Sequence, residues 1–186
     1  MLNVPNFLTL LRLIAIPIFL ILLVDRRYSE ALAVFIAAGI TDSLDGMIAR
    51  MTHTKTVLGA YLDPAADKLL LMSSFTALAF MDEVPRWVVV IVLSRDVMLV
   101  LGYFLLFTMT SSAMEVRPSP IGKFSTFLQL AAVTTVLVSL VWPGVVPPVL
   151  EESLFYLAGA VTATAGLQYM YRGLVWLQGH GGPQPG

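Results

Sequence analysis

The sequence predicts an all-α fold, a polytopic membrane protein built as a bundle of six transmembrane helices. Of its 186 residues, 58% are hydrophobic and only 12% are charged, and the mean hydropathy is +0.84. This composition lies outside the usual range of soluble globular domains. Six apolar stretches also reach the roughly 20 helical residues that are needed to cross the hydrocarbon core of a bilayer.

The first three predicted spans are Pro5 to Val24, Ser29 to Arg50 and Val57 to Phe80. A charged turn separates the first from the second, and a polar turn separates the second from the third. The first stretch has no basic region before it, carries Arg12 inside it and shows no clear small-residue cleavage site. We therefore expect it to be retained as a span and not removed as a signal peptide.

The last three predicted spans are Arg86 to Met109, Pro120 to Val141 and Leu150 to Trp176. Charged or Pro- and Gly-bearing interruptions again mark their limits. Residues 1–178 are thus expected to form a single transmembrane domain. The Gly- and Pro-rich residues 179–186 are expected to form a disordered tail.

Basic residues indicate how the bundle is oriented, because six spans place both termini on the same side of the membrane. The basic residues on the terminal side are Arg50, Lys55, Arg117, Lys123 and Arg172. Those on the opposite side are Arg26, Arg27 and Arg86. This bias predicts termini in the cytoplasm, and we expect the cell inner membrane as the location.

Charge and cysteine content exclude several kinds of function. The net charge is -1 and no basic run is present, so we expect no nucleic-acid partner. The chain has no cysteine, which excludes disulfides, thiolate metal sites and thiol nucleophiles. Chemistry therefore has to come from oxygen and nitrogen groups.

Four aspartates lie in the apolar segments on either side of the polar turn: Asp42, Asp45, Asp63 and Asp67. Each intramembrane carboxylate costs a few kcal/mol to insert, so four together indicate a compensating cation and a function. The first two are three residues apart and the last two are four apart, so each pair lines one face of its helix. At about 1.5 Å of rise per residue, the two pairs reach matching depth.

Such a cluster predicts a metal site, because hard divalent cations relieve the repulsion between carboxylates through oxygen ligation. We expect Mg²⁺ or Mn²⁺, and two ions that share carboxylates suit phosphoryl transfer. Zinc is disfavoured by the ligand types. The small residues Gly46, Ala49 and Gly59 let a flat group such as a nucleotide base approach the backbone. Arg50 and Lys68 supply positive charge for a pyrophosphate.

Together these residues form the pattern Asp42-x-x-Asp45-Gly46-x-x-Ala49-Arg50, then eight residues, then Gly59-x-x-x-Asp63-x-x-x-Asp67. The pattern resembles the signature of the CDP-alcohol phosphatidyltransferases, and every signature position is filled. The resemblance implies that an acceptor hydroxyl displaces CMP from a CDP-linked lipid, in a membrane-embedded bundle whose site opens to the cytoplasm. Because members of the family are often homodimers, it also implies a homodimer.

The resemblance assigns a role to each signature residue. The implied metal ligands are Asp42, Asp45, Asp63 and Asp67. The implied CDP pocket consists of Asp45, Gly46, Ala49, Arg50 and Gly59. Asp67 is also the implied catalytic base, and loss of the acceptor proton to water stays open as the alternative.

The implied acceptor-binding residues are Arg95, Lys123 and Lys68, near an acceptor phosphate. The stretch from Asn3 to Arg12 resembles the start of phosphatidylglycerophosphate synthases and of eukaryotic-type cardiolipin synthases, so the implied partners are CDP-diacylglycerol and a glycerol-bearing acceptor, besides membrane lipids. The stretches Arg95-Asp96-Val-Met-Leu and Ser119-Pro-x-x-Lys123-x-x-Thr slightly favour phosphatidylglycerol, which gives cardiolipin. Glycerol 3-phosphate, which gives phosphatidylglycerophosphate, is the closest alternative.

Other functions remain open at the level of the sequence. Another acceptor such as inositol phosphate fits the same signature. An ion-coupled transporter also uses intramembrane aspartates, although it would not require the spacing of the small residues and Arg50. An intramembrane prenyltransferase binds pyrophosphate through Asp-rich helices as well. Finally, Arg95 and Asp96 have a purely structural interpretation, in which they satisfy other buried groups.

Overall fold

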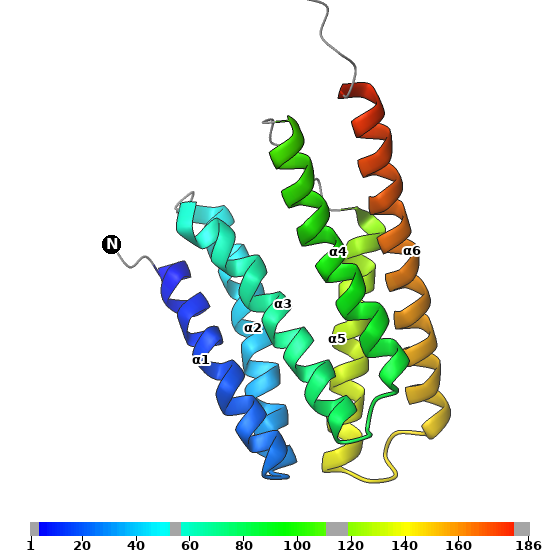
Figure 1. Cartoon of the computed structure of the whole chain (residues 1–186). Helices are drawn as coiled ribbons and strands as arrows, with labels where there is room; N and C mark the ends of the chain where they lie inside the picture. The colour runs from blue at the N-terminus through cyan, green and yellow to red at the C-terminus, as the bar shows by residue number, and fades with distance from the viewer. Residues whose placement is uncertain (1–3, 53–56, 111–118, 181–186) are drawn as a thin grey trace, which may run out of the picture.

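The computed structural model describes the backbone of residues 4–52, 57–110 and 119–180, and the side chains of residues 10–41, 66–102 and 119–175. Throughout these ranges the chain is helical or in turns, which confirms the all-α prediction. The helices are α1 (Val4–Val24), α2 (Tyr28–Thr52), α3 (Val57–Phe80), α4 (Arg86–Thr110), α5 (Pro120–Val141) and α6 (Pro148–His180). They run alternately up and down, so the three short connections gather at one end of the bundle (Figure 1).

The limits of the helices agree closely with those predicted. The bounds of α3 and α5 are the predicted ones, and those of α1, α2 and α4 differ by one or two residues. The largest difference is at α6, which begins at Pro148 and continues past Trp176 to His180. The helix therefore includes the first two residues of the expected tail, whose remaining residues 181–186 lie outside the described part of the chain.

One helix of the described chain, α5, is long and apolar enough by itself to cross a membrane. Shorter apolar stretches cover Leu10–Val24 in α1 and Tyr28–Thr41 in α2. The six helices are 21 to 33 residues long, which satisfies the length that a bilayer core requires. That all six of them cross a membrane stays a prediction.

Helix α1 ends in a tight turn that brings the chain straight back as α2. The amide of Arg27 donates to the carbonyl of Leu22 over 2.8 Å, and Arg26 has a φ of 58°. This is the left-handed ending that glycine usually provides. Helix α3 ends in the same conformation at Asp82, whose φ is 60°. Both turns are short, so α1 stays against α2 and α3 stays against α4.

The apolar core lies in the half of the bundle near these short connections. All six helices contribute to it. Its fully buried large side chains are Phe19, Leu23, Phe35, Phe75, Leu78, Val88, Val92, Val133 and Leu137. The rings of Phe19 and Phe35 lie 5.6 Å apart between α1 and α2. Dense apolar packing here fixes the helices relative to one another.

Helix α5 is joined to α6 by buried polar groups. Ser119 caps the start of α5, where its hydroxyl accepts from the amide of Gly122 over 3.0 Å, a common way to satisfy a free helix-terminal donor. Further along, the hydroxyls of Ser125 and Thr162 lie 2.7 Å apart. The amide nitrogen of Gln129 donates to Thr162 over 2.9 Å. Because these groups are buried, their hydrogen bonds favour one register of α5 against α6.

The outer surface of the bundle is largely apolar. Each helix exposes large hydrophobic side chains, for example Ile21, Ile40, Leu69, Val100, Phe127 and Leu167. Extended exposed apolar surface of this kind marks contact with a membrane or with another protein.

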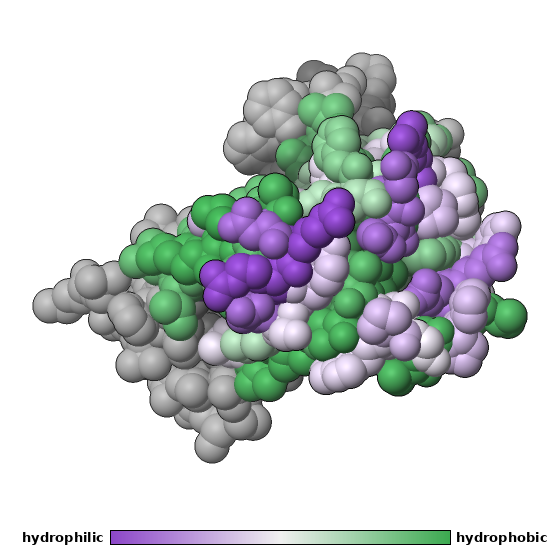
Figure 2. Space-filling model, turned by 90° about the horizontal axis from the view of Figure 1, so that it is seen from below, coloured by the Kyte–Doolittle hydropathy of each residue, from purple (hydrophilic) through white to green (hydrophobic). Residues whose placement is uncertain are grey.

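Charged side chains gather at the end of the bundle that contains the α1–α2, α3–α4 and α5–α6 turns. Figure 2 views that end of the molecule and shows several groups of hydrophilic side chains on it. Two exposed ion pairs lie there, Arg27 with Glu30 at 2.9 Å and Arg86 with Asp82 at 3.0 Å. An apolar wall with a charged end is the distribution expected of a bundle that sits in a bilayer.

Gly159 allows α6 to approach α4 closely, and replacing it should destabilise the bundle. An added Cβ would lie 2.5 Å from the ring of Trp87, which itself stacks on Tyr156 at a centroid distance of 5.3 Å. We expect Gly159→Ala to destabilise the fold by about 1–3 kcal/mol, the usual effect of overpacking. The matched control is Gly102→Ala, because a Cβ there meets nothing within 4 Å. Thermal unfolding in detergent is the measurement, and equal midpoints for the two variants would contradict the packing described.

Candidate active site

The four aspartates belong to two helices that are consecutive in the chain, α2 and α3. Asp42 and Asp45 lie in the second half of α2, which ends at Thr52, and Asp63 and Asp67 lie in the first half of α3, which begins at Val57. Only residues 53–56 separate α2 from α3, which keeps both pairs near the same end of the bundle, opposite the α1–α2, α3–α4 and α5–α6 turns. Several signature side chains lie outside the described residues: those of Asp42, Asp45, Gly46, Ala49, Arg50, Gly59 and Asp63. Their roles therefore stay predictions.

Asp67 forms an ion pair with Arg12 of α1. The distance between Nη1 of Arg12 and Oδ1 of Asp67 is 2.5 Å, and the side chain of Arg12 is only 1% exposed while that of Asp67 is 39% exposed. The pair links two helices across 55 residues of sequence. The sequence signalled Arg12 only through the energetic cost of an arginine inside an apolar span, and no role was assigned to it.

The donor set at this end fits a hard divalent cation. The carboxylate of Asp67 pairs with Arg12 and is still 39% exposed, so one side of it remains open to a further ligand. Within the described side chains, no three His, Cys, Asp or Glu residues come together. The predicted metal centre thus depends on the oxygen ligands Asp42, Asp45 and Asp63 in addition to Asp67, and such ligands suit Mg²⁺ or Mn²⁺.

A second charged group includes Lys68, the residue that follows Asp67 in α3. Oδ1 of Asp96 accepts hydrogen bonds from Nζ of Lys68 at 2.8 Å and from Nη1 of Arg95 at 2.6 Å. Arg95 and Asp96 are 6% and 7% exposed. One carboxylate therefore neutralises only one of two cations, and the remaining positive charge favours binding of an anion.

Tyr169 and Ser119 complete this group from α6 and α5. The guanidinium of Arg95 lies over the ring of Tyr169, 5.8 Å from its centroid, which is within the range of a cation–π contact. The hydroxyl of Tyr169 accepts from the amide of Ser119 at 2.9 Å. At Gly122, an added Cβ would lie 3.3 Å from Nη2 of Arg95, so the glycine gives the guanidinium room against α5. We call Lys68, Arg95, Asp96, Ser119 and Tyr169 the buried polar cluster.

The structure unites two of the three predicted acceptor-binding residues. Lys68 and Arg95 meet on Asp96, whereas Lys123 lies exposed on the first turn of α5 and takes part in none of the ion pairs between described side chains. Lys68 also directly follows Asp67, so the buried polar cluster adjoins the aspartate site. Tyr169 was missed from the sequence, because an aromatic residue near the end of a span is usually an interfacial anchor.

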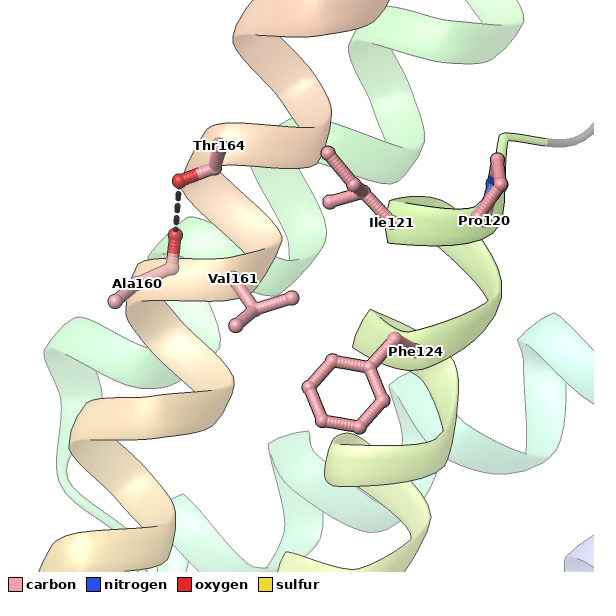
Figure 3. A pocket seen from close by; sticks show the side chains of 6 residues that line it. All are labelled: Pro120, Ile121, Phe124, Ala160, Val161 and Thr164. Atoms are coloured by element: carbon pink, nitrogen blue, oxygen red, sulfur yellow. Dashed lines mark hydrogen bonds between the residues drawn. The ribbon is translucent and has the colours of Figure 1, made fainter.

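Among the described residues, one apolar groove lies next to Ser119 of the buried polar cluster and another reaches Arg12 of the ion pair with Asp67; both are on the outside of the bundle. The larger, about 490 Å³ in volume, lies between α5 and α6 and is lined by Pro120, Ile121, Phe124, Ala160, Val161 and Thr164 (Figure 3). The smaller, about 200 Å³, lies between α1 and α2 and reaches Arg12. We call them the α5/α6 groove and the α1/α2 groove.

Comparison with known proteins identifies the family. Residues 2–165 match the family described as CDP-alcohol phosphatidyltransferase. The chain belongs to this family. It is therefore a phosphatidyltransferase, which confirms the family that the resemblance of the aspartate pattern indicated. Enzymes of the family are membrane-bound phospholipid synthases that generally depend on a divalent metal.

Individual relatives of this phosphatidyltransferase carry two different names. A probable phosphatidylglycerophosphate synthase of Mycobacterium tuberculosis is 34% identical over 178 residues, with 92% of this chain and 82% of that protein covered. A probable cardiolipin synthase (CMP-forming) of Drosophila melanogaster is 32% identical, with 90% and 56% covered. The human cardiolipin synthase (CMP-forming) is 29% identical, with 92% and 62% covered. The chain thus spans little more than half the length of the two animal relatives.

The ion pair between Arg12 and Asp67 gives a direct test of this part of the site. We expect Arg12→Gln to slow CMP release at least about tenfold, because it leaves an uncompensated charge at Asp67. Arg12→Lys keeps the charge and should retain more activity than the glutamine variant. The control is Arg27→Gln, which removes an arginine from the exposed pair with Glu30. A normal rate of CMP release in Arg12→Gln would show that the pair is not part of the active site.

Proposed function

We propose that this phosphatidyltransferase moves the phosphatidyl group of CDP-diacylglycerol to a glycerol-bearing acceptor and releases CMP. Phosphatidylglycerol, which gives cardiolipin, is the favoured acceptor, and glycerol 3-phosphate is the second candidate. The observation that carries the proposal is the buried polar cluster, in which Lys68 and Arg95 share the carboxylate of Asp96 and Lys68 directly follows Asp67 in α3. The names of the relatives, cardiolipin synthase and phosphatidylglycerophosphate synthase, support a glycerol-bearing acceptor.

In the proposed reaction, the acceptor hydroxyl attacks the lipid-linked phosphorus of CDP-diacylglycerol. A new bond forms between that phosphorus and the acceptor oxygen, while the bond to the phosphate of CMP breaks and CMP leaves with the electron pair. Two divalent ions held by Asp42, Asp45, Asp63 and Asp67 would neutralise charge on the diphosphate. By the family resemblance, Asp45, Gly46, Ala49, Arg50 and Gly59 line the CDP pocket.

Asp67 is the residue to which we assign removal of the acceptor proton. Its carboxylate pairs with Arg12, and more than a third of its side chain is exposed, so a hydroxyl group can approach it. The pairing with Arg12 also orients the carboxylate, which a general base requires. Proton transfer to water remains the alternative route, as the sequence already indicated.

The acceptor phosphate is assigned to Arg95 and Lys68. Arg95 is fixed by Asp96 on one side and by the ring of Tyr169 on the other, and a pre-oriented guanidinium binds phosphate well. Lys123 is exposed on the first turn of α5, where its backbone amide donates to the carbonyl of Ser119 over 3.1 Å, and it stays a candidate for contact with the acceptor. Inositol phosphate carries the same phosphate, so it stays an alternative acceptor that this cluster alone does not exclude.

We further propose that all six helices cross a membrane, the cell inner membrane, with the aspartate end facing the cytoplasm and residues 1–178 forming one domain. The exposed apolar side chains on every helix support the bilayer location. The placement of basic residues toward the terminal side supports the orientation. A homodimer is carried over from the family resemblance.

The function is tested by supplying purified protein with Mg²⁺ or Mn²⁺, CDP-diacylglycerol and a single acceptor. Phosphatidylglycerol, glycerol 3-phosphate and inositol phosphate are offered separately, and released CMP is measured. We expect CMP release with phosphatidylglycerol and loss of that release when a chelator removes the metal. Release with inositol phosphate alone would reject the glycerol-bearing acceptor, while leaving the family assignment in place.

Asp96 should act by positioning the two cations of the cluster. We expect Asp96→Asn to raise KM for the acceptor about tenfold, because an amide holds Lys68 and Arg95 less firmly than a carboxylate does. KM for CDP-diacylglycerol should change much less, and Asp96→Glu should restore part of the acceptor affinity. Asp82→Asn, in the exposed pair with Arg86, serves as the control. Equal increases of both KM values would assign Asp96 to general stability instead.

A further inference from the structure

The α5/α6 groove has a chemistry that suits an alkyl chain. Figure 3 shows Ile121 and Phe124 of α5 and Val161 of α6 pointing into the space between the helices. The one hydroxyl of the lining, that of Thr164, donates to the carbonyl of Ala160 at 2.8 Å. Since this hydroxyl is already satisfied, the groove presents no polar group that needs a partner, and apolar ligands fit it best.

The groove and the buried polar cluster occupy neighbouring positions in the sequences of α5 and α6. Its first residue, Pro120, directly follows Ser119, which belongs to the cluster. On α6, Tyr169 lies five residues beyond Thr164, or about 7 Å along the helix axis at 1.5 Å per residue. The exposed ammonium group of Lys123 lies on the same turn of α5 as Phe124. A cationic cluster above an apolar groove matches a molecule with an anionic head and a hydrocarbon tail.

We propose that the α5/α6 groove holds an acyl chain of the acceptor, so that the acceptor is a diacyl phospholipid and not a water-soluble glycerol phosphate. The inference rests on the proposed function, because it deepens the assignment of the acceptor phosphate to Arg95 and Lys68. A volume of about 490 Å³ lies within the range of about 300–1,000 Å³ found for ligand pockets. Phosphatidylglycerol has both the phosphate and the chain that this arrangement requires.

The other lipid substrate is a poorer match for this groove. CDP-diacylglycerol is assigned to the aspartates of α2 and α3, and the α1/α2 groove reaches Arg12, the partner of Asp67. Helices α1 and α6 lie at opposite sides of the bundle (Figure 1). The α5/α6 groove is thus adjacent to the acceptor residues, on the far side from the helix that holds Arg12.

Filling the groove tests the proposal. Ala160→Phe places a ring in the groove, and the matched control is Ala163→Phe, an exposed position of the same helix that does not line it. We expect Ala160→Phe to raise KM for long-chain phosphatidylglycerol about tenfold, which corresponds to the loss of about two buried methylene groups. KM for CDP-diacylglycerol and for dihexanoyl-phosphatidylglycerol, whose chains are short, should stay within about twofold. An unchanged KM for the long-chain lipid, or a shift in that of CDP-diacylglycerol, would overturn the proposal.

A second measurement does not depend on turnover. Wild-type protein is irradiated with a phosphatidylglycerol that carries a diazirine on one acyl chain, and the labelled residues are mapped by mass spectrometry. Labelling of the α5 and α6 residues of the groove, reduced by excess long-chain phosphatidylglycerol, supports the proposal; labelling elsewhere rejects it.

Absence of CMP release with every acceptor would reject the proposed function, whereas CMP release with glycerol 3-phosphate alone would reject this inference and leave the transferase activity intact.

Discussion

Two adjacent residues of α3, Asp67 and Lys68, hold the charged interior of the bundle together. Asp67 pairs with Arg12 of α1, and Lys68 pairs with Asp96 of α4. Successive residues of a helix point in directions about 100° apart, so α3 presents a negative group to one neighbour and a positive group to another. Each charge that is removed from water here has an opposite partner, which is the condition for burying it. Because Asp67 and Lys68 are adjacent in α3, the proposed aspartate site and the proposed acceptor site are linked through this helix.

Along its length the bundle has two halves: an apolar half that stabilises the fold and a charged half that contains the proposed site. Near the short connections, tightly packed side chains such as Phe19, Phe75 and Leu137 form a dry core, which provides the main stabilising contribution. Toward the opposite end, charged and polar residues replace them. Unpaired charges there would be destabilising, so the pairing in the charged half depends on the register that the apolar packing fixes. The hydrogen bonds of Gln129 and Thr162 lie between these two regions.

The helices were predictable because their signals are local. Apolar stretches of helix length, bounded by charged or Pro-bearing turns, gave the limits of α3 and α5 as the structure has them. The partners inside the site were not predictable in this way. Arg12 and Asp67 are 55 residues apart, and Tyr169 is 50 residues from Ser119, so no spacing rule relates them. Their association follows from how α1, α3, α5 and α6 pack, which depends on the whole core.

The position of the apolar groove bears on the proposed choice of acceptor. The α5/α6 groove includes Pro120, which directly follows Ser119 of the buried polar cluster, and the one hydroxyl of its lining already donates to the carbonyl of Ala160. A water-soluble glycerol phosphate would leave this groove without a ligand. A phospholipid, in contrast, can place its phosphate at the cations of the cluster and an acyl chain against the apolar side chains. This match of chemistry on neighbouring positions of α5 and α6 is the basis of the proposed phospholipid acceptor.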